Sequence, residues 1–117
     1  LKDGAQTLLN FGVSADALLP TLRNLGDVSG GDAERFSRLA LAFGQVMGKG
    51  RLMGQEVNQM IEAGFNPLQE ISRTTGKSMA KLSEEMEAGQ ISSRMLAAAF
   101  ASAAGPGGRF HGMMKQQ

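Results

Sequence analysis

Glycine divides this chain into segments the length of short helices. Of its 117 residues, 16 are glycine, about twice the average share. Because glycine adopts the left-handed conformation without a steric penalty, it commonly ends a helix. The expected helix ends are Leu25–Gly26, Met47–Gly48, Ala63–Gly64, Thr75–Gly76, Ala88–Gly89 and Ala104–Gly105. A chain with this many helix ends favours several short helices over one long helix.

Residues that cap the beginning of a helix follow most of these stops. From each expected helix start to the next stop, apolar residues recur with helical spacing, as Phe36, Leu39 and Phe43 do. No stretch alternates with the period of a strand. The expected helix starts are Ser14, Asp32, Asn66, Ser78 and Ser92. The sequence therefore predicts an all-α fold of about six short helices, with Pro20 kinking or restarting the segment that contains it.

The helical signals end at Ala104, where a Gly-Pro-Gly-Gly run begins. We therefore expect one compact helical domain over residues 1–104 and a flexible tail or linker over residues 105–117. The chain begins with Leu1 rather than methionine, which suggests a fragment of a longer protein.

Two of the expected turns share a local pattern. In both, a glycine is followed two residues later by an apolar residue, and a helix then begins: Gly50 and Leu52 in one turn, Gly89 and Ile91 in the other. We expect Leu52 and Ile91 to fill the core from these turns. A short backbone bridge between the turns is one alternative, and two unrelated glycine-stopped hairpins are the other. The residues assigned to structural turns are Gly48, Gly50, Leu52, Gly64, Gly89 and Ile91.

The composition argues against several classes of protein. A formal net charge of +1 lacks the basic excess of a dedicated nucleic-acid binder, so we expect no sequence-specific nucleic-acid partner. Without cysteine, the chain has no disulfide and no thiolate zinc site. The longest apolar stretch, residues 95–104, is about half of the ~20 residues that a membrane span needs. We therefore expect no membrane span in this chain.

No combination of residues points to catalysis. The pair Gly76-Lys77 resembles the end of a phosphate-binding loop, but the required earlier glycine is replaced by Ile71. The acidic cluster at 84–87 fits a solvated helix face better than a general acid/base pair. His111 is the only histidine and lies beyond the glycine-rich break. The sequence thus predicts no enzyme, no cofactor and no metal site.

Small residues at helical spacing are the strongest candidates for interaction. Gly44 and Gly48 lie four residues apart, and residues 97–104 are almost free of bulk on one side. Such surfaces allow another helix to approach closely. The alternatives are tight packing inside the domain and an exposed docking groove for a partner helix. The candidate surface residues are Gly44, Gly48, Ala97, Ala101 and Ala104.

The order of several short motifs resembles a known family. These motifs lie at residues 44–45, 49–52, 54–57, 64–68 and 89–92, and an upstream piece spans residues 11–28. Over roughly residues 8–100, the chain resembles the N-terminal conserved region of phage tail tape measure proteins. The resemblance implies a structural role: such proteins fix tail length during assembly, fill the tail tube and leave with the genome.

The resemblance also implies partners and a location. The expected partners are the tail tube protein, the tail assembly chaperone and the tail tip or initiator proteins, and self-association is compatible with it. The expected location is the host bacterial cytoplasm during assembly and the virion tail afterwards. We interpret the chain as an assembly module that mediates protein–protein contacts, with a helical adaptor of another assembly as the alternative. As a compact domain it would span about 35 Å, against roughly 175 Å as one helix.

Overall fold

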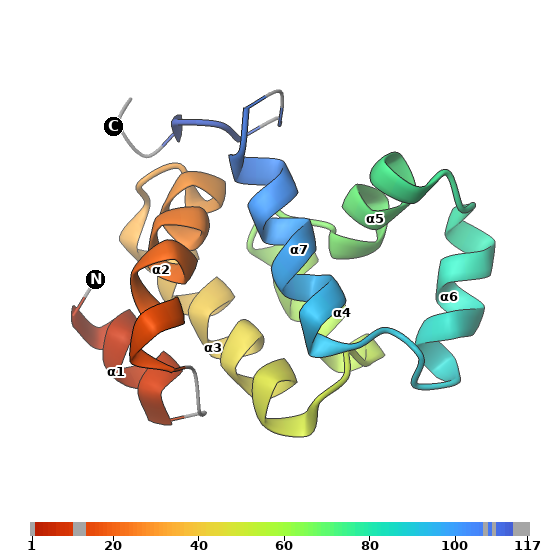
Figure 1. The fold of residues 1–117 in the computed structure, drawn as a ribbon, viewed down its shortest axis with the longest axis horizontal. Helices are drawn as coiled ribbons and strands as arrows, with labels where there is room; N and C mark the ends of the chain where they lie inside the picture. The colour runs from red at the N-terminus through yellow and green to blue at the C-terminus, as the bar shows by residue number, and fades with distance from the viewer. Residues whose placement is uncertain (1, 11–13, 107, 109, 114–117) are drawn as a thin grey trace.

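Seven α-helices make up the part of the chain that the computed structural model describes, which is residues 2–10, 14–106, 108 and 110–113. Within these residues no β-strand forms, so the predicted all-α class is confirmed (Figure 1). One more helix forms than the six expected from the sequence. The additional helix is the first one in the chain, for which the sequence had shown neither a cap nor a glycine stop. The helices are α1 (Lys2–Asn10), α2 (Ala15–Ser29), α3 (Ala33–Lys49), α4 (Gly54–Glu62), α5 (Pro67–Thr75), α6 (Met79–Glu87) and α7 (Ser93–Ala104).

All five predicted helix starts are confirmed as caps. The side chains of four of them, Ser14, Asp32, Ser78 and Ser92, accept a hydrogen bond from the backbone N–H three residues later. Asn66 accepts from two N–H groups, 3.1 and 3.2 Å away, ahead of a proline in the first turn of α5. Each cap satisfies a donor that the first helical turn would otherwise leave without a partner.

Two predicted helix ends were wrong by a few residues. α2 continues through Gly26 to Ser29 and is capped by Gly30 at φ 67°. α3 continues through Gly48 to Lys49 and is capped by Gly50 at φ 85°. A glycine inside a helix costs only about 1 kcal/mol, whereas the left-handed cap position favours glycine strongly, so the second glycine ends each helix.

Pro20 lies inside α2 and does not restart it. Proline removes one backbone donor from the helix ladder, but the helix after it remains anchored. Leu25 and Val28, further along α2, are both fully buried in the core. Tertiary packing of this later stretch offsets the local penalty.

The core is assembled around α3 and α7. Helices α1, α2 and α3 pack on one another, α7 packs on α2, α3 and α5, and α6 packs mainly on α5 at the edge of the molecule (Figure 1). The ring of Phe100 on α7 lies 5.6 Å from that of Phe43 on α3 and 4.5 Å from that of Phe65, between ring centroids. The extents of 35 × 30 × 25 Å and the radius of gyration of 13.0 Å confirm the expected compact dimensions.

The two similar turns lie side by side and form an isolated antiparallel bridge. The N–H of Leu52 donates to the carbonyl of Ile91 at 2.8 Å, and the N–H of Ser93 donates to that of Gly50 at 3.0 Å. The bridged pair is Arg51 and Ser92, each one residue away from the apolar residues of the sequence pattern. Leu52 and Ile91 are both fully buried.

None of the described helices is long and apolar enough to cross a membrane.

Candidate functional site

The small residues proposed as a docking surface do not lie on one open face. Gly44 and Ala104 are buried, Ala97 is half-buried, and only Gly48 and Ala101 are exposed. Gly44 and Ala104 therefore serve packing within the domain and cannot line an open surface. At the residues assigned to turns, Gly50, Gly64 and Gly89 have φ values of 85°, 97° and 73°, whereas Gly48 is helical, as described above.

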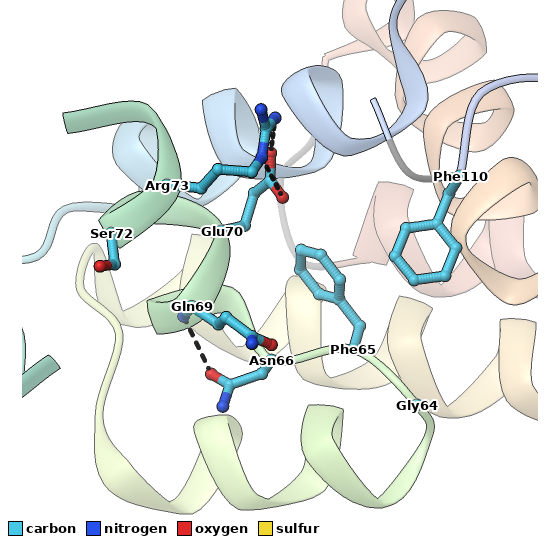
Figure 2. Close-up of a pocket in the computed structure, with 8 residues that line it drawn as sticks. All are labelled: Gly64, Phe65, Asn66, Gln69, Glu70, Ser72, Arg73 and Phe110. Atoms are coloured by element: carbon cyan, nitrogen blue, oxygen red, sulfur yellow. Dashed lines mark hydrogen bonds and ion pairs between the residues drawn. The ribbon is translucent and has the colours of Figure 1, made fainter. Parts of the chain in front are cut away.

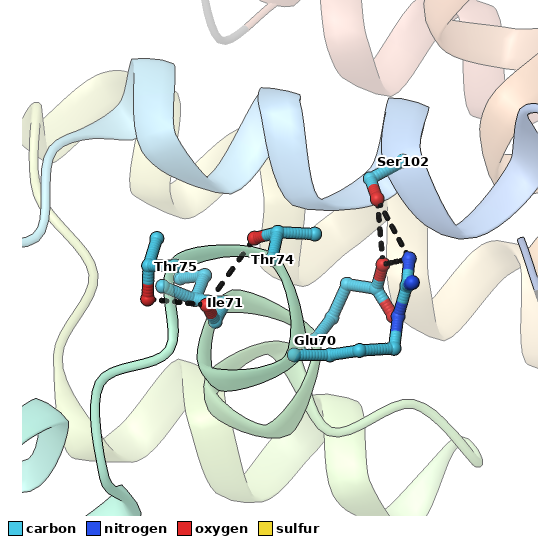
Figure 3. Close-up of polar contacts among 6 residues, drawn as sticks. Glu70, Ile71, Thr74, Thr75 and Ser102 are labelled. Atoms are coloured by element: carbon cyan, nitrogen blue, oxygen red, sulfur yellow. Dashed lines mark hydrogen bonds and ion pairs between the residues drawn. The ribbon is translucent and has the colours of Figure 1, made fainter.

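The small side chains of α7 instead leave a hollow against α5. This hollow, of about 300 Å³, follows the seam between the two helices. On α5 the hydroxyls of Thr74 and Thr75 both donate to the carbonyl of Ile71, so their methyl groups remain to line the seam (Figure 3). The hollow is lined by Ile71, Thr74, Thr75, Met95, Ala98, Ala99 and Ser102. The seam is therefore an apolar surface with few polar groups.

At one end of the seam, a polar cluster joins the two helices. The carboxylate of Glu70, which is 7% exposed, accepts a hydrogen bond from the Ser102 hydroxyl at 2.7 Å. It also pairs with the guanidinium of Arg73 at 2.5 Å, and Arg73 in turn donates to Ser102 at 2.9 Å (Figure 3). Three side chains from two helices thus satisfy one another's hydrogen-bonding groups.

The surroundings of Glu70 shift its ionisation. Burial raises the pKa of the Glu70 carboxyl, but the hydrogen bonds from Arg73 and Ser102 and the positive charge of Arg73 outweigh it and hold that pKa below its usual value. The hydrogen bond and charge of Glu70 correspondingly raise the pKa of Arg73. The cluster is therefore an ion pair at neutral pH, suited to holding two helices together rather than to moving protons.

A second hollow, of about 350 Å³, opens beside this cluster (Figure 2). Phe110, from the segment after α7, lies across it from Phe65, with ring centroids 6.1 Å apart. The backbone N–H of Phe110 donates to the carbonyl of Ala103 at 2.8 Å, which fixes this segment against the end of α7. The lining residues are Gly64, Phe65, Asn66, Gln69, Glu70, Ser72, Arg73 and Phe110. Aromatic faces beside amide and charged groups suit contact with a polypeptide.

The residues that could have supported catalysis are placed elsewhere. The Nδ1 atom of His111 lies 2.8 Å from the carbonyl oxygen of Ala104, so the imidazole is bound to backbone. Glu85 pairs with Lys77 at 2.9 Å. Among the described residues, no group of three histidine or carboxylate side chains is placed to hold a metal ion.

A fully buried carboxylate, not predicted from the sequence, lies at the start of α4. Glu56 has no exposed side-chain surface; it accepts from the N–H of Met53 at 3.2 Å and from the Nζ of Lys49 at 2.7 Å. A glutamate three residues after the cap position is the acidic half of a capping box, so the spacing from Met53 could have indicated it. The buried role of Glu70 had no such local signal, because its partner Ser102 lies 32 residues away.

Comparison with models of known protein families gives a match over nearly the whole chain. The model of a family described as "tape measure protein" matches residues 2–117. No curated protein and no solved structure matches the chain. The family match covers nearly the whole chain, including all seven described helices.

Proposed function

The chain belongs to the tape measure protein family, a family of structural proteins of phage tails, and from this premise we propose that it is a folded assembly module that mediates protein–protein contacts during tail assembly. It is part of a longer tape measure chain, and it does not itself measure length. Its partners are other tail components: the tail tube, the tail assembly chaperone and the tail tip or initiator proteins.

The compactness of the domain carries this proposal. A molecular ruler needs a length proportional to its number of residues, as a continuous helix provides at about 1.5 Å per residue. Here the seven short helices of the described residues fold back on one another, and the longest extent is 35 Å. The buried rings of Phe43, Phe65 and Phe100 come from three separate segments and would lose their contacts if the chain were extended.

The seam between α5 and α7 and the hollow beside Phe110 are the surfaces through which the module contacts other tail proteins. The seam offers methyl groups and small residues, and the hollow offers two aromatic rings and a paired charge. Such a combination of apolar area with a few polar groups is typical of surfaces that bind polypeptide.

An in-frame deletion of residues 2–104 from the tape measure gene tests the proposal. Tails are then measured by electron microscopy. We expect either no tails or tails of near-normal length, because the deleted module contributes assembly contacts and little length. The matched control deletes the same number of residues from another helical part of the same protein, which should shorten tails by roughly 155 Å at the helical rise per residue. Viable phage whose tails shorten in proportion to the deletion of residues 2–104 would contradict the proposal.

A further inference from the structure

The segment that follows α7 lies against the end of that helix, and the described part of residues 108–113 is called the strap below. The N–H of Phe110 donates to the carbonyl of Ala103 at 2.8 Å, and Nδ1 of His111 lies 2.8 Å from the carbonyl oxygen of Ala104. The last four carbonyls of a helix have no partner within the helix itself. The strap therefore supplies partners for two carbonyls at the end of α7.

The strap depends on a close approach of its backbone to α7 at Gly108. A Cβ at this position would overlap the carbonyl oxygens of Ser102 and Ala103. Glycine permits such an approach because it has no side chain. Any larger residue at position 108 should therefore lift the strap away from the helix.

The strap also places an aromatic ring at the outer end of a row of rings. Phe43, Phe65 and Phe100 form the buried part of this row. Phe110 is only half-buried, and its ring centroid lies 6.1 Å from that of Phe65 (Figure 2). Phe110 thus covers Phe65 from outside and does not belong to the buried core.

Three properties make the strap easier to displace than a core helix. Its bonds to α7 go to carbonyls at a helix end, where water can replace the donor once the strap has left. Gly108 and Gly112 lose more conformational freedom on ordering than other residues do. The ring of Phe110 is only partly buried, and the hollow of about 350 Å³ beside Phe65 gives a second polypeptide room to approach.

We propose that the strap is a displaceable cover, and that an aromatic side chain on a polypeptide segment of a tail partner takes the place of Phe110. This inference rests on the proposed function of the hollow as a contact surface and names the chemistry of the partner. The position already holds an aromatic ring, which packs edge-to-face on Phe65 at an interplanar angle of 74°. The aromatic ring of a partner would make the same contact.

Polar side chains next to Phe65 suit the backbone of such a segment. The amide oxygen of Asn66 accepts two N–H groups at the start of α5, so its NH2 group remains to donate. Gln69, three residues further on, is exposed and offers both a donor and an acceptor. Both residues line the hollow. An aromatic anchor with a few polar groups around it is typical of a binding site.

The first test asks whether the strap opens while the rest of the domain stays folded. Native-state hydrogen exchange of the purified chain compares the Phe110 amide with amides in the middle of α7. The Phe110 amide should exchange at least about a hundredfold faster, at a rate that hardly changes with low urea concentrations, because it needs only local opening. Equal rates with the same dependence on urea would make the strap a permanent part of the core and overturn the proposal.

The second test asks what the uncovered position accepts. The double variant Gly108→Ala with Phe110→Ala dislodges the strap and removes its ring, and circular dichroism checks that the helices remain. A synthetic peptide of residues 108–113 is titrated into this variant and followed by NMR shifts around Phe65. It should bind with a Kd on the order of 1 mM. The same peptide with the Phe110→Ala change should bind about tenfold more weakly, because it lacks the aromatic contact.

Two further proteins complete the second test. The wild-type chain should bind the peptide at least about fivefold more weakly than the double variant, because its tethered strap competes at a high effective concentration. Gly76→Ala is the matched control, since it adds a Cβ where no atom lies within 4 Å and leaves the strap in place. It should bind the peptide no better than the wild-type chain does.

Loss of the helices in the double variant would show that the strap is part of the core and would overturn the proposal. Equal binding of the peptides with and without the aromatic ring would overturn it as well, as would equal binding to the wild-type chain and the double variant. All of these measurements use the purified chain, so such a failure would leave the tail-length test of the proposed function unaffected.

Discussion

The turn between α3 and α4 and the seam between α5 and α7 each bury a glutamate, but the two glutamates act over different ranges. In the turn, Glu56 is bound by Lys49 and by the N–H of Met53, all within seven residues of one another. In the seam, Glu70 is bound by Arg73 on its own helix and by Ser102 on α7. The first carboxylate organises a local turn, whereas the second joins distant parts of the chain.

The two glutamates differ in how far along the chain their partners lie, so one depends on local structure and the other on tertiary packing. The Glu56 contacts can form as soon as α3 and α4 adopt their helices. The Glu70 cluster is complete only after α7 has docked, because it needs Ser102. We therefore expect substitutions in the turn to act on a fully buried charge, and substitutions in the seam to act on the joint between two helices.

The largest effect should come from leaving the fully buried carboxylate without its cation. Lys49→Met retains most of the side-chain volume but leaves Glu56, with no exposed surface, bound only by a backbone N–H. We expect the free energy of unfolding to fall by about 3 kcal/mol, measured by urea denaturation. The matched variant Arg73→Met should cost less than Lys49→Met, because Glu70 keeps the Ser102 hydroxyl and some access to water.

If Lys49→Met and Arg73→Met lowered the free energy of unfolding equally, the turn and the seam would not differ in how strongly their glutamates depend on a cation. A larger loss for Arg73→Met would reverse it and make the seam the more critical of the two.

The seam should respond to acid through Glu70. Because the folded-state pKa of Glu70 lies below the usual 4.5, the unfolded chain binds more protons between the two values. The ionised carboxylate then contributes stability that is fully present above pH 4.5 and is lost as the pH falls through the lower folded value. Glu70→Gln should therefore cost about 1–2 kcal/mol at neutral pH, and the difference from wild type should shrink below pH 4.5.

Denaturation curves of both proteins at several pH values check this expectation. A difference that stays constant with pH would mean that the ion pair of Glu70 does not stabilise the seam. Ser102→Ala is a useful companion variant, because it removes the contact to α7 while leaving the Arg73 pair intact.

The local part of this architecture was predictable from the sequence and the distant part was not. Caps such as Asn66 act on backbone groups two or three residues away, so their pattern is visible in the chain. The apolar pattern around Leu52 and Ile91 likewise anticipated two buried turns. The partnership of Glu70 with Ser102 depends on how α7 packs against α5, and no local pattern records that packing.

The choice between Gly48 and Gly50 as the end of α3 was also decided by tertiary structure. Both glycines can adopt the left-handed cap, so the sequence left two candidates close together. The carbonyl of Gly50 accepts the N–H of Ser93, the first residue of α7, at 3.0 Å. This bridge holds Gly50 at the cap position and leaves Gly48 within the helix.

Replacing the glycine cap by alanine should lower the free energy of unfolding by a similar amount in the two regions. Gly50 ends α3 and Gly76 ends α5, with φ values of 85° and 79°, and a Cβ at either position would meet no atom within 4 Å. Backbone strain alone should make Gly50→Ala and Gly76→Ala each cost about 1 kcal/mol. Matching losses would show that turn and seam differ in their carboxylates and not in their helix ends, whereas a much larger loss at Gly50 would show that the backbone bridge adds to the strain.

The smallest effect, and one of opposite sign, should occur at Gly48. This glycine is exposed and lies in the last turn of α3, one residue before Lys49. Alanine has a higher helix propensity than glycine because it loses less backbone entropy. Gly48→Ala should therefore raise the free energy of unfolding by about 0.5 kcal/mol, and it should also strengthen the frame that holds Lys49 against Glu56. If Gly48→Ala instead lowered the free energy of unfolding as much as Gly50→Ala, α3 would end at Gly48. Lys49 would then lie outside the helix and would no longer be held against Glu56, so the distinction between the two buried glutamates would lose its basis.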